Sequence, residues 1–480
     1  MRIGLATRHA SPHYIPLALL YLKAYLVERQ GHPFEDVPIL EFDRDCDHER
    51  IARDLLAAEP DVLGLSCYVW NVRALLAAAR QVKAARPNVR IVIGGPEVGP
   101  VARAVLEAHP WVDVVVQSEG EIPFAGVVAA WKAGRGVESV PGIAFREGTR
   151  VVENVEAPLL RDLNALPSPH TAQYASGPGR IICIETQRGC VFRCNFCFYN
   201  KDLSVRNRRF DLERVKAEIL FWLQQEGVRQ IYLMDPIFNL DARRAKEICR
   251  FIIAHNQRRV PFHSEVWAEF IDEELARLMR EAPLTLEVGL QTTDATALAT
   301  VERRLRVKPF VDGIRWLKQQ GLSFELQLIY GLPGETLASF RQSLNFAMSL
   351  DPPDLAVFPL MVLPGTELWQ KADGLGLRFD PDPPYYVREH GSMGAADVEF
   401  GARMIDAIGH LGHSRTIRFL CREPGLAFDQ IVDEWIAWWP NQPDTEPAMT
   451  KLRRFVEHVC ATRGIPPRFY QGFASFEFKE

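Results

Sequence analysis

Short apolar runs alternate with segments of helical periodicity along most of this chain. In the first 150 residues the apolar runs predict strands, and the segments between them predict helices (strands 2–6, 62–67, 90–93 and 112–116; helices 17–30, 72–85 and 101–108). Strands that alternate with helices form a parallel sheet with helices on both faces, and ligands bind beyond the carboxyl ends of its strands. We therefore expect an α/β protein that begins with a doubly wound parallel sheet.

The alternation resumes after residue 180 and predicts six more strands (181–186, 230–234, 262–266, 285–290, 323–329 and 355–360). Six β/α units form about three-quarters of a TIM-like barrel, whose chemistry lies at the carboxyl ends of the strands. We place a short hairpin and a Pro-, Gly- and Ser-rich junction at 135–180. The predicted regions are a Rossmann-like domain (1–150), a linker (151–180), a partial (β/α)6 barrel (181–375) and a smaller, mainly helical C-terminal domain (376–480).

An aromatic run, EWIAWWP, lies in the C-terminal region and contains Trp435, Trp438 and Trp439. Such residues most often pack in a core. The alternative is a lid that closes the open mouth of the barrel over a substrate and keeps water out.

The composition excludes several classes of protein. With 47% apolar and 24% charged residues the chain is an ordinary globular protein, and its net charge of -5 argues against a nucleic-acid partner. No apolar run approaches the ~20 residues that span a membrane, and the first residues lack the apolar region of a signal peptide. We therefore expect a cytoplasmic location and no membrane partner.

Three closely spaced cysteines mark a candidate metal centre. The stretch TQRGCVFRCNFCFYNKD holds Cys190, Cys194 and Cys197 at C-x3-C-x2-C spacing. An iron-sulfur cluster with four irons and three protein thiolates keeps one iron open for another ligand, whereas structural zinc needs a fourth Cys or His. The nearest candidates, Cys183 and His170, have irregular spacing. The six other cysteines have no partner spacing, so a disulfide framework is not expected.

The stretch CVFRCNFC, with an aromatic residue directly before its third cysteine, resembles the cluster loop of the radical S-adenosylmethionine (SAM) superfamily. This resemblance implies a 4Fe-4S cluster held by the three cysteines. It also implies that SAM binds the open iron, and that an electron donor such as flavodoxin or ferredoxin reduces the cluster.

Polar residues and glycines at the ends of the barrel strands resemble the SAM site of the oxygen-independent coproporphyrinogen dehydrogenase branch. There a Glu, a Gln and an Arg hold the SAM ribose and carboxylate, which implies these roles for Glu265, Gln291 and Arg303. We expect these three residues to contact SAM and to stay clear of the cluster. The alternatives are a Glu265–Arg303 ion pair, a satisfied core amide at Gln291, and Arg304 in place of Arg303.

Two other strand ends are candidates for the same site. Asp235 follows the second barrel strand, where other superfamily members carry a G-G-E-like turn that meets the SAM amino group; Gly-Gly is missing here, so position alone supports Asp235. The motif GLPGE places Gly331 after the fifth strand and is also consistent with a simple strand-to-helix turn. Asp202 and Arg206 have no assigned role.

The N-terminal strand ends GLSCYVWN, IGGPEVG and QSEGE resemble those of the cobalamin-binding domain that precedes many radical SAM domains. The resemblance implies cobalamin contacts from these loops, which contain Ser66, Gly94, Gly95, Glu119 and Gly120. The D-x-H-x-x-G motif, which supplies an axial histidine in the methionine synthase class, is absent. We therefore expect cobalamin to bind base-off and without histidine on cobalt. The alternative is a degenerate domain that keeps only the fold.

Both resemblances together imply a cobalamin-dependent radical SAM methyltransferase. Such an enzyme uses a 5'-deoxyadenosyl radical and methylcobalamin to methylate an unactivated carbon, here in a small-molecule or peptide natural product. A cyclisation, ring contraction or oxidation with the same cofactors, as in the anaerobic Mg-protoporphyrin cyclase, is the first alternative. A non-catalytic cobalamin-binding sensor is the second.

Overall fold

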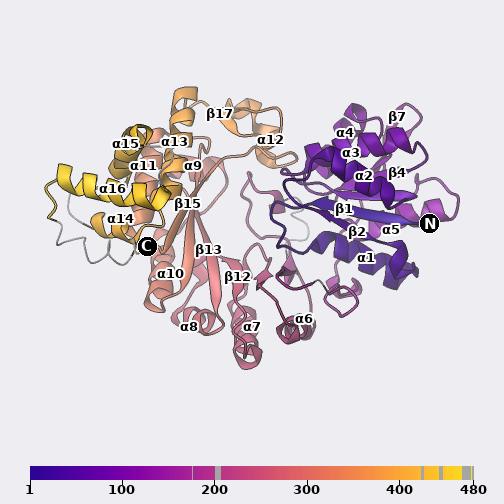
Figure 1. Ribbon diagram of the computed structural model, residues 1–480, viewed down its shortest axis with the longest axis horizontal. Helices are drawn as coiled ribbons and strands as arrows, with labels where there is room; N and C mark the ends of the chain where they lie inside the picture. Colours follow the sequence, from indigo (N-terminus) through magenta and orange to yellow (C-terminus); the bar gives the residue numbers. More distant parts are fainter. Residues whose placement is uncertain (176, 201–206, 423–425, 443–446, 467–476, 478–480) are drawn as a thin grey trace.

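A computed structural model of the 480-residue chain describes all residues except 176, 201–206, 423–425, 443–446, 467–476 and 478–480. The N-terminal part contains a sheet of seven strands in the order β2-β1-β3-β4-β5-β6-β7. Figure 1 shows this part in indigo and purple, beside the central part of the chain. Its strands are β1 (Ile3–Arg8), β2 (Ile39–Phe42), β3 (Val62–Ser66), β4 (Arg90–Gly94), β5 (Val114–Val116), β6 (Ile143–Glu147) and β7 (Arg150–Glu153). The first five in this order are parallel, which confirms the predicted doubly wound sheet.

Helices cover both faces of this sheet. One face carries α1 (Leu17–Gln30) and α5 (Glu121–Lys132), and the other carries α2 (His48–Ala57), α3 (Val72–Ala85) and α4 (Ala102–Ala108). Because both faces are covered, a strand such as β3 is buried along almost its whole length. The core therefore lies in two layers, one on each side of the sheet.

The hairpin placed in the bridge is instead part of the sheet. Strand β6 pairs antiparallel with β5, and β7 pairs antiparallel with β6. The hairpin can join the sheet because β5 would otherwise be an edge strand with unpaired backbone groups. The expected short linker therefore begins only after Glu153, the last residue of β7.

The central part is a six-stranded parallel sheet in the order β15-β14-β13-β12-β11-β8, which confirms the predicted partial barrel. Its strands are β8 (Ile181–Ile184), β11 (Gln230–Leu233), β12 (Phe262–Val266), β13 (Leu284–Gln291), β14 (Ser323–Tyr330) and β15 (Asp354–Pro359). The helices around it are α6 (Leu212–Gln224), α7 (Ala242–His255), α8 (Glu273–Glu281), α9 (Ala295–Thr300), α10 (Val307–Gln319) and α11 (Leu337–Ser349). Buried and partly exposed residues alternate along β12, β13 and β14, so each strand has an apolar outer face beneath the helices and a more polar inner face.

The C-terminal part is mainly helical, as predicted. It contains α12 (Glu367–Lys371), the short pair β16 (Arg378–Phe379) and β17 (Val387–Glu389), and the helices α13 (Ala395–Leu411), α14 (Arg415–Leu420), α15 (Phe428–Trp438) and α16 (Ala448–Thr462). Short 3₁₀ turns connect elements along the chain: η1 (Phe34–Asp36), η2 (Gly99–Val101), η3 (Leu163–Ala165), η4 (Phe198–Asn200), η5 (Phe238–Leu240), η6 (Ala268–Phe270), η7 (Asp373–Leu375) and η8 (Trp439–Asn441).

The C-terminal tryptophans belong to a packed core. Trp435 is 1% exposed and packs against Phe455 and Trp439, with ring centroids 4.8 and 4.7 Å away. Helices α13 and α15 lie against β15 and α11 at the edge of the barrel. The packing interpretation is therefore confirmed for Trp435, whose burial leaves it no freedom to close over a substrate.

The N-terminal sheet is joined to the first barrel strand. The Ile181 amide donates to the carbonyl of His13 at 2.7 Å, and Ile15 donates back to Ile181 at 3.2 Å. Helix α1 extends this contact, because Tyr21 lies in the same apolar core as the barrel strands. No helix in the described part of the chain is both long and apolar enough to cross a lipid bilayer.

Candidate active site

The three cysteines lie in a loop whose ends are paired. The cysteine loop, residues 189–207, begins after β9 (Gln187–Arg188) and ends before β10 (Arg208–Arg209), and these two short strands pair antiparallel. Within the loop Asn195 is buried, and its backbone and side-chain amides donate to the carbonyls of Val301 and Thr300 at 3.1 and 2.8 Å. These bonds fix the loop to the end of α9. Asp202 and Arg206 lie outside the described residues.

The cysteine thiols are close enough to influence one another. Cys194 is buried, and Cys190 and Cys197 are partly exposed. Burial raises the pKa of Cys190; burial, with the charges of Cys194, Cys190 and Glu265, raises the pKa of Cys197 to about 12. Iron binding must therefore displace protons from these thiols.

The spacing of these thiols fits a cluster better than one metal ion. Among the residues that the structure describes, no three Cys, His, Asp or Glu side chains are grouped as ligands of a single ion. A 4Fe-4S cluster distributes its thiolates over separate irons, so its ligands need not converge on one point. His170 is not grouped with these thiols as a metal ligand among the described residues; it is buried against Trp222, whose Nε1 donates to its Nδ1 at 3.0 Å.

Asp235 holds the chain that enters the cysteine loop. Its carboxylate accepts from the backbone amide and the hydroxyl of Thr186 at 2.8 and 2.5 Å, and from the amide of Gln187 at 3.2 Å. Burial raises its pKa to about 7. Both carboxylate oxygens are thus engaged with the end of β8, so any contact with SAM is left to the backbone of this turn.

Gln291 has a strained backbone conformation at the end of β13. It closes a bulge at the end of β13 and has a left-handed φ of 72°, which costs energy for a residue with a side chain. Its side-chain oxygen is buried without a hydrogen-bond donor. A satisfied core amide, the alternative interpretation, would have such a donor, so that alternative is not formed, and contact between Gln291 and SAM stays a prediction.

Arg303 lies between the end of β13 and the cysteine loop. Its Nη2 donates to the carbonyl of Gly289 at 2.6 Å, and its Nη1 lies 3.7 Å from the Sγ of Cys194. Arg303 therefore contacts one of the three cysteines, and its expected role of binding SAM without touching the cluster stays a prediction. Its Nε is buried and unpaired, whereas Arg304 is exposed. The arrangement favours Arg303 over Arg304 as the residue that meets a ligand.

An aromatic residue that the motifs did not indicate supports Arg303. The guanidinium carbon lies 4.4 Å from the ring centre of Trp267, which also stacks on Phe192 of the cysteine loop at 4.0 Å. Asn239 holds the backbone of Trp267 through two bonds of 2.9 Å. In the sequence, the contact of Trp267 with Arg303 was indicated only by the position of Trp267, which directly follows β12 and lies two residues beyond Glu265.

Glu265 points into a polar barrel interior. It accepts from the hydroxyl of Tyr232 at 3.0 Å, and burial followed by the charge of Glu287 raises its pKa to about 7. On neighbouring strands, Glu287 accepts from Gln327 at 3.1 Å and lies 2.9 Å from His263 Nε2. The predicted alternative of a Glu265–Arg303 ion pair is not formed. Near neutral pH Glu265 can therefore accept or donate a hydrogen bond.

The GLPGE motif forms a tight turn after β14. Gly331 has a left-handed φ of 87°, and the buried carboxyl of Glu335 accepts from the Thr292 hydroxyl at 2.7 Å. Burial raises the pKa of Glu335 to about 8. These contacts support the interpretation of the motif as a turn; contact between Gly331 and SAM stays a prediction.

Ser66, Gly94 and Gly95 lie together at the carboxyl edge of the N-terminal sheet. Gly95 has a φ of 114°, and a Cβ there would lie 2.4 Å from the carbonyl oxygen of Cys67. The turn therefore requires glycine so that the two loops can approach each other. Beside it, Tyr68 and Trp70 stack with centroids 4.5 Å apart, and Trp70 is 49% exposed. This pair offers a flat apolar surface of the kind that a corrin ring can cover.

The histidines that follow β1 have other partners. His9 Nε2 lies 2.7 Å from a Glu41 oxygen, and His13 Nε2 lies 3.0 Å from Arg229. These contacts agree with the missing D-x-H-x-x-G motif and with cobalt that carries no histidine.

Glu119 is directed toward the barrel and not toward the sheet edge. Its carboxylate accepts from Arg208 Nη1 at 2.9 Å and also contacts Arg208 Nη2. Gly120 is the residue before α5, and a Cβ there would lie 3.3 Å from Leu22. The structure thus gives Glu119 an ionic partner in the barrel domain, and its predicted cobalamin contact stays untested.

Two protein families match the two parallel sheets. The B12 binding domain model matches residues 4–128, and the Radical SAM superfamily model matches residues 184–347. A B12-binding domain followed by a radical SAM domain defines the cobalamin-dependent radical SAM family, and the chain belongs to it. The predicted cofactor set of cobalamin, a 4Fe-4S cluster and SAM is confirmed by these matches.

The chain is similar both to a relative named as a methyltransferase and to one named as a cyclase. It is 32% identical over 356 residues to the cobalamin-dependent radical SAM methyltransferase TokK of Streptomyces tokunonensis, an alignment that covers 69% of this chain and 51% of TokK. It is 27% identical over 341 residues to the anaerobic magnesium-protoporphyrin IX monomethyl ester cyclase of Cereibacter sphaeroides, with 68% and 55% covered. The chain thus spans about half the length of these relatives.

A solved structure shares the fold. The radical SAM methyltransferase TsrM of Kitasatospora setae, solved with cobalamin and a [4Fe-4S] cluster bound, superposes with a TM-score of 0.65 at 19% identity. The match covers 80% of this chain and 78% of TsrM. Fold similarity therefore extends over both parallel sheets.

Proposed function

We propose that the chain is a methyltransferase that acts on an unactivated carbon of a small-molecule or peptide natural product. The observation that carries this proposal is that the carboxyl ends of the two sheets meet. Glu119, in the loop after β5, is bonded to Arg208, at the base of the cysteine loop. A substrate between the two sheets would thus be within reach of both cofactors.

The chain's own residues would bind and orient these groups. When bound, the cluster supplies an electron that cleaves SAM and starts a radical reaction, and cobalamin carries the methyl group. Cys190, Cys194 and Cys197 would hold the cluster, with the N–H of Arg303 directed at Cys194. The unpaired Nε of Arg303 fits the SAM carboxylate, and the unpaired oxygen of Gln291 fits a ribose hydroxyl.

The barrel interior would hold the substrate through hydrogen bonds. Tyr232, His263 and Glu287 line consecutive strands and already bond to their neighbours, so their side chains are oriented before a ligand arrives. A reducing cytoplasm suits the free thiols of the chain, and a flavodoxin- or ferredoxin-like donor would supply electrons.

A SAM-labelling experiment tests the proposal. Protein reconstituted without oxygen with iron, sulfide and hydroxocobalamin is incubated with reductant, a metabolite extract and SAM that carries a deuterated methyl group. We expect 5'-deoxyadenosine, S-adenosylhomocysteine and a product that carries the label. Cys194→Ala, which lacks one cluster ligand, serves as the control and should form no 5'-deoxyadenosine.

The cyclase relative favours a second candidate, a radical ring closure or oxidation with the same cofactors. That reaction forms 5'-deoxyadenosine but no S-adenosylhomocysteine and transfers no label. Such a result would refute methyl transfer while leaving radical SAM chemistry in place.

A further inference from the structure

Two arginines face each other at the base of the cysteine loop. Arg188 is the last residue of β9 and Arg208 is the first of β10, and the two are direct partners in the antiparallel pair. Directly opposed residues place their side chains on the same face, where like charges destabilise the pair. In the described part of the chain, the base of the loop is closed by these two strands alone. Negative charge from another part of the chain is therefore needed to offset the repulsion between the two arginines.

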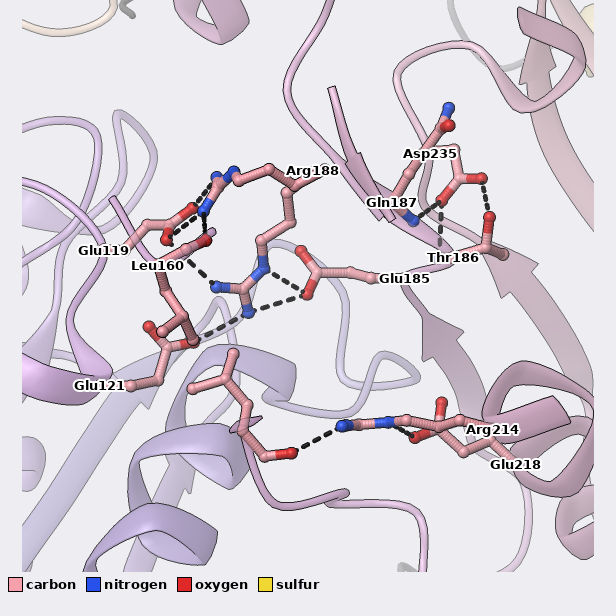
Figure 2. A network of polar contacts seen from close by, with 12 residues as sticks. Glu119, Glu121, Leu160, Glu185, Thr186, Gln187, Arg188, Arg214, Glu218 and Asp235 are labelled. Atoms are coloured by element: carbon pink, nitrogen blue, oxygen red, sulfur yellow. Dashed lines mark hydrogen bonds and ion pairs between the residues drawn. The ribbon is translucent and has the colours of Figure 1, made fainter. Parts of the chain in front are cut away.

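That charge comes from the N-terminal domain. Glu119 lies in the loop after β5 and Glu121 is the first residue of α5, and both reach across to the hairpin (Figure 2). Glu121 accepts from Arg188 Nη2 at 2.8 Å, and Glu119 accepts from Arg208 Nη1 at 2.9 Å and lies 3.8 Å from Arg188. Each guanidinium therefore has a carboxylate from the other domain.

These ion pairs are shielded from water. The side chains of Arg208, Glu121 and Arg188 are 6, 9 and 12% exposed, so solvent screens their charges little. Burial by itself would raise the pKa of Glu121, but Arg188 and Arg208 hold it below its usual value. Removal of Glu119 would leave the buried guanidinium of Arg208 without its carboxylate partner.

The barrel domain's own carboxylate is a poor substitute. Glu185 lies 2.9 Å from Arg188, but burial, together with the charges of Glu121 and Glu119, raises its pKa. Its carboxyl group is therefore a weaker acid than that of Glu121. Neutralisation of the hairpin depends on the N-terminal domain.

The two domains do not need these glutamates to stay together. Backbone bonds of Ile181 with His13 and Ile15 join them, and a hydrogen bond from Tyr385 to Glu97 ties the C-terminal part to the N-terminal sheet. What distinguishes the two glutamates is that they pair with arginines at the base of the cysteine loop. Arg188 lies only two residues before Cys190. Through Arg188 and Arg208, their ion pairs therefore hold the base of the cysteine loop, while other bonds hold the domains together.

We propose that Glu119 and Glu121 are positioning residues that hold the base of the cysteine loop in place from the cobalamin-binding domain. The junction between β5 and α5 thereby sets where the cluster lies relative to the edge of the N-terminal sheet. The inference rests on the proposed function only in assigning a cluster to the cysteine loop. The ion pairs are contacts within the chain and do not depend on that function.

Hydrogen exchange of the full-length chain, purified without oxygen, tests this inference. The variant carries Glu119→Gln and Glu121→Gln, which keep side-chain size and remove both charges. Glu153→Gln is the matched control, because Glu153 lies in the same domain and pairs with Arg103 of that domain at 2.6 Å. We expect peptides that contain residues 187–199 and 208–210 to exchange about 10-fold faster in the double variant and not in the control.

Three outcomes would overturn the inference: equal exchange of the hairpin in the variant and the control, faster exchange spread evenly over both domains, or a hairpin unprotected in the unsubstituted chain. A second pair of variants keeps the test independent of the glutamates. Arg208→Lys should retain much of the protection because it keeps the charge, and Arg208→Gln should lose it. Exchange is measured without substrate, so a chain that transfers no methyl group can still pass this test.

Discussion

The Arg303→Ala substitution probes the contact between the chain and SAM. A guanidinium has five N–H donors; one of those in Arg303 donates to Gly289 and another points at Cys194, while Nε is buried and unpaired. A SAM carboxylate that accepts from this group forms a charge-assisted bond worth about 1.5–3 kcal/mol. Its loss should weaken SAM binding about 10- to 150-fold.

The assay is equilibrium dialysis of SAM against anaerobically reconstituted protein, with iron content and melting temperature measured on the same samples. Arg304→Ala is the matched control, since Arg304 is the adjacent residue, carries the same charge and is exposed. It should bind SAM with nearly unchanged affinity. The reasoning fails if Arg303→Ala keeps its iron and binds SAM as tightly as the unsubstituted chain, or if both variants lose affinity equally.

Further predictions concern other parts of the chain. Gly95→Ala should cost about 1–3 kcal/mol of stability, because its Cβ would lie 2.4 Å from Cys67; Gly94→Ala, with 3.4 Å to its nearest neighbour, should be milder in urea unfolding, and equal effects would contradict this. Burial raises the pKa of Asp235 to about 7, so between about pH 4 and 7 the native state keeps a proton that the unfolded state has lost, and stability falls as pH rises. Asp235→Asn should reduce this slope in urea titrations of the cluster-free protein, and an unchanged slope would argue against it. Trp435→Ala should cost about 3–5 kcal/mol, because a fully buried ring is lost; a loss below about 1 kcal/mol in urea unfolding would show that this core is not well packed. Electron paramagnetic resonance of bound cob(II)alamin should show no nitrogen splitting, and a nitrogen-coordinated signal would refute cobalt without histidine.

Much of the fold could be predicted because its strands follow simple patterns. The run Val62–Ser66 is apolar throughout, as expected of a strand covered on both faces, and the barrel strands end at turns rich in polar residues and glycine. Strand β2 and helix α2 were not predicted, since Ile39–Phe42 is short and only partly buried. The hairpin at 143–153 was recognised, but its pairing with β5 depends on a distant strand and has no local signal.

The three candidate cluster cysteines could be recognised from their spacing and from the resemblance of their loop, whereas contacts between side chains could not. Asp235 was placed correctly at a strand end, but the sequence does not show that its carboxylate turns back to Thr186. Arg188 and Arg208 were missed because their partners lie in another domain, at positions 119 and 121. Glu119 was predicted from its motif to contact cobalamin. The structure shows that its carboxylate accepts a hydrogen bond from Arg208.

The central claim is that three cysteines hold a cluster with one iron open for SAM. Protein purified and reconstituted without oxygen should contain about four irons and four sulfides per chain. Addition of SAM should then change the electron paramagnetic resonance signal of the reduced cluster, because SAM binds the open iron. Stoichiometric zinc in the purified protein, or a cluster signal that SAM leaves unchanged, would contradict the account.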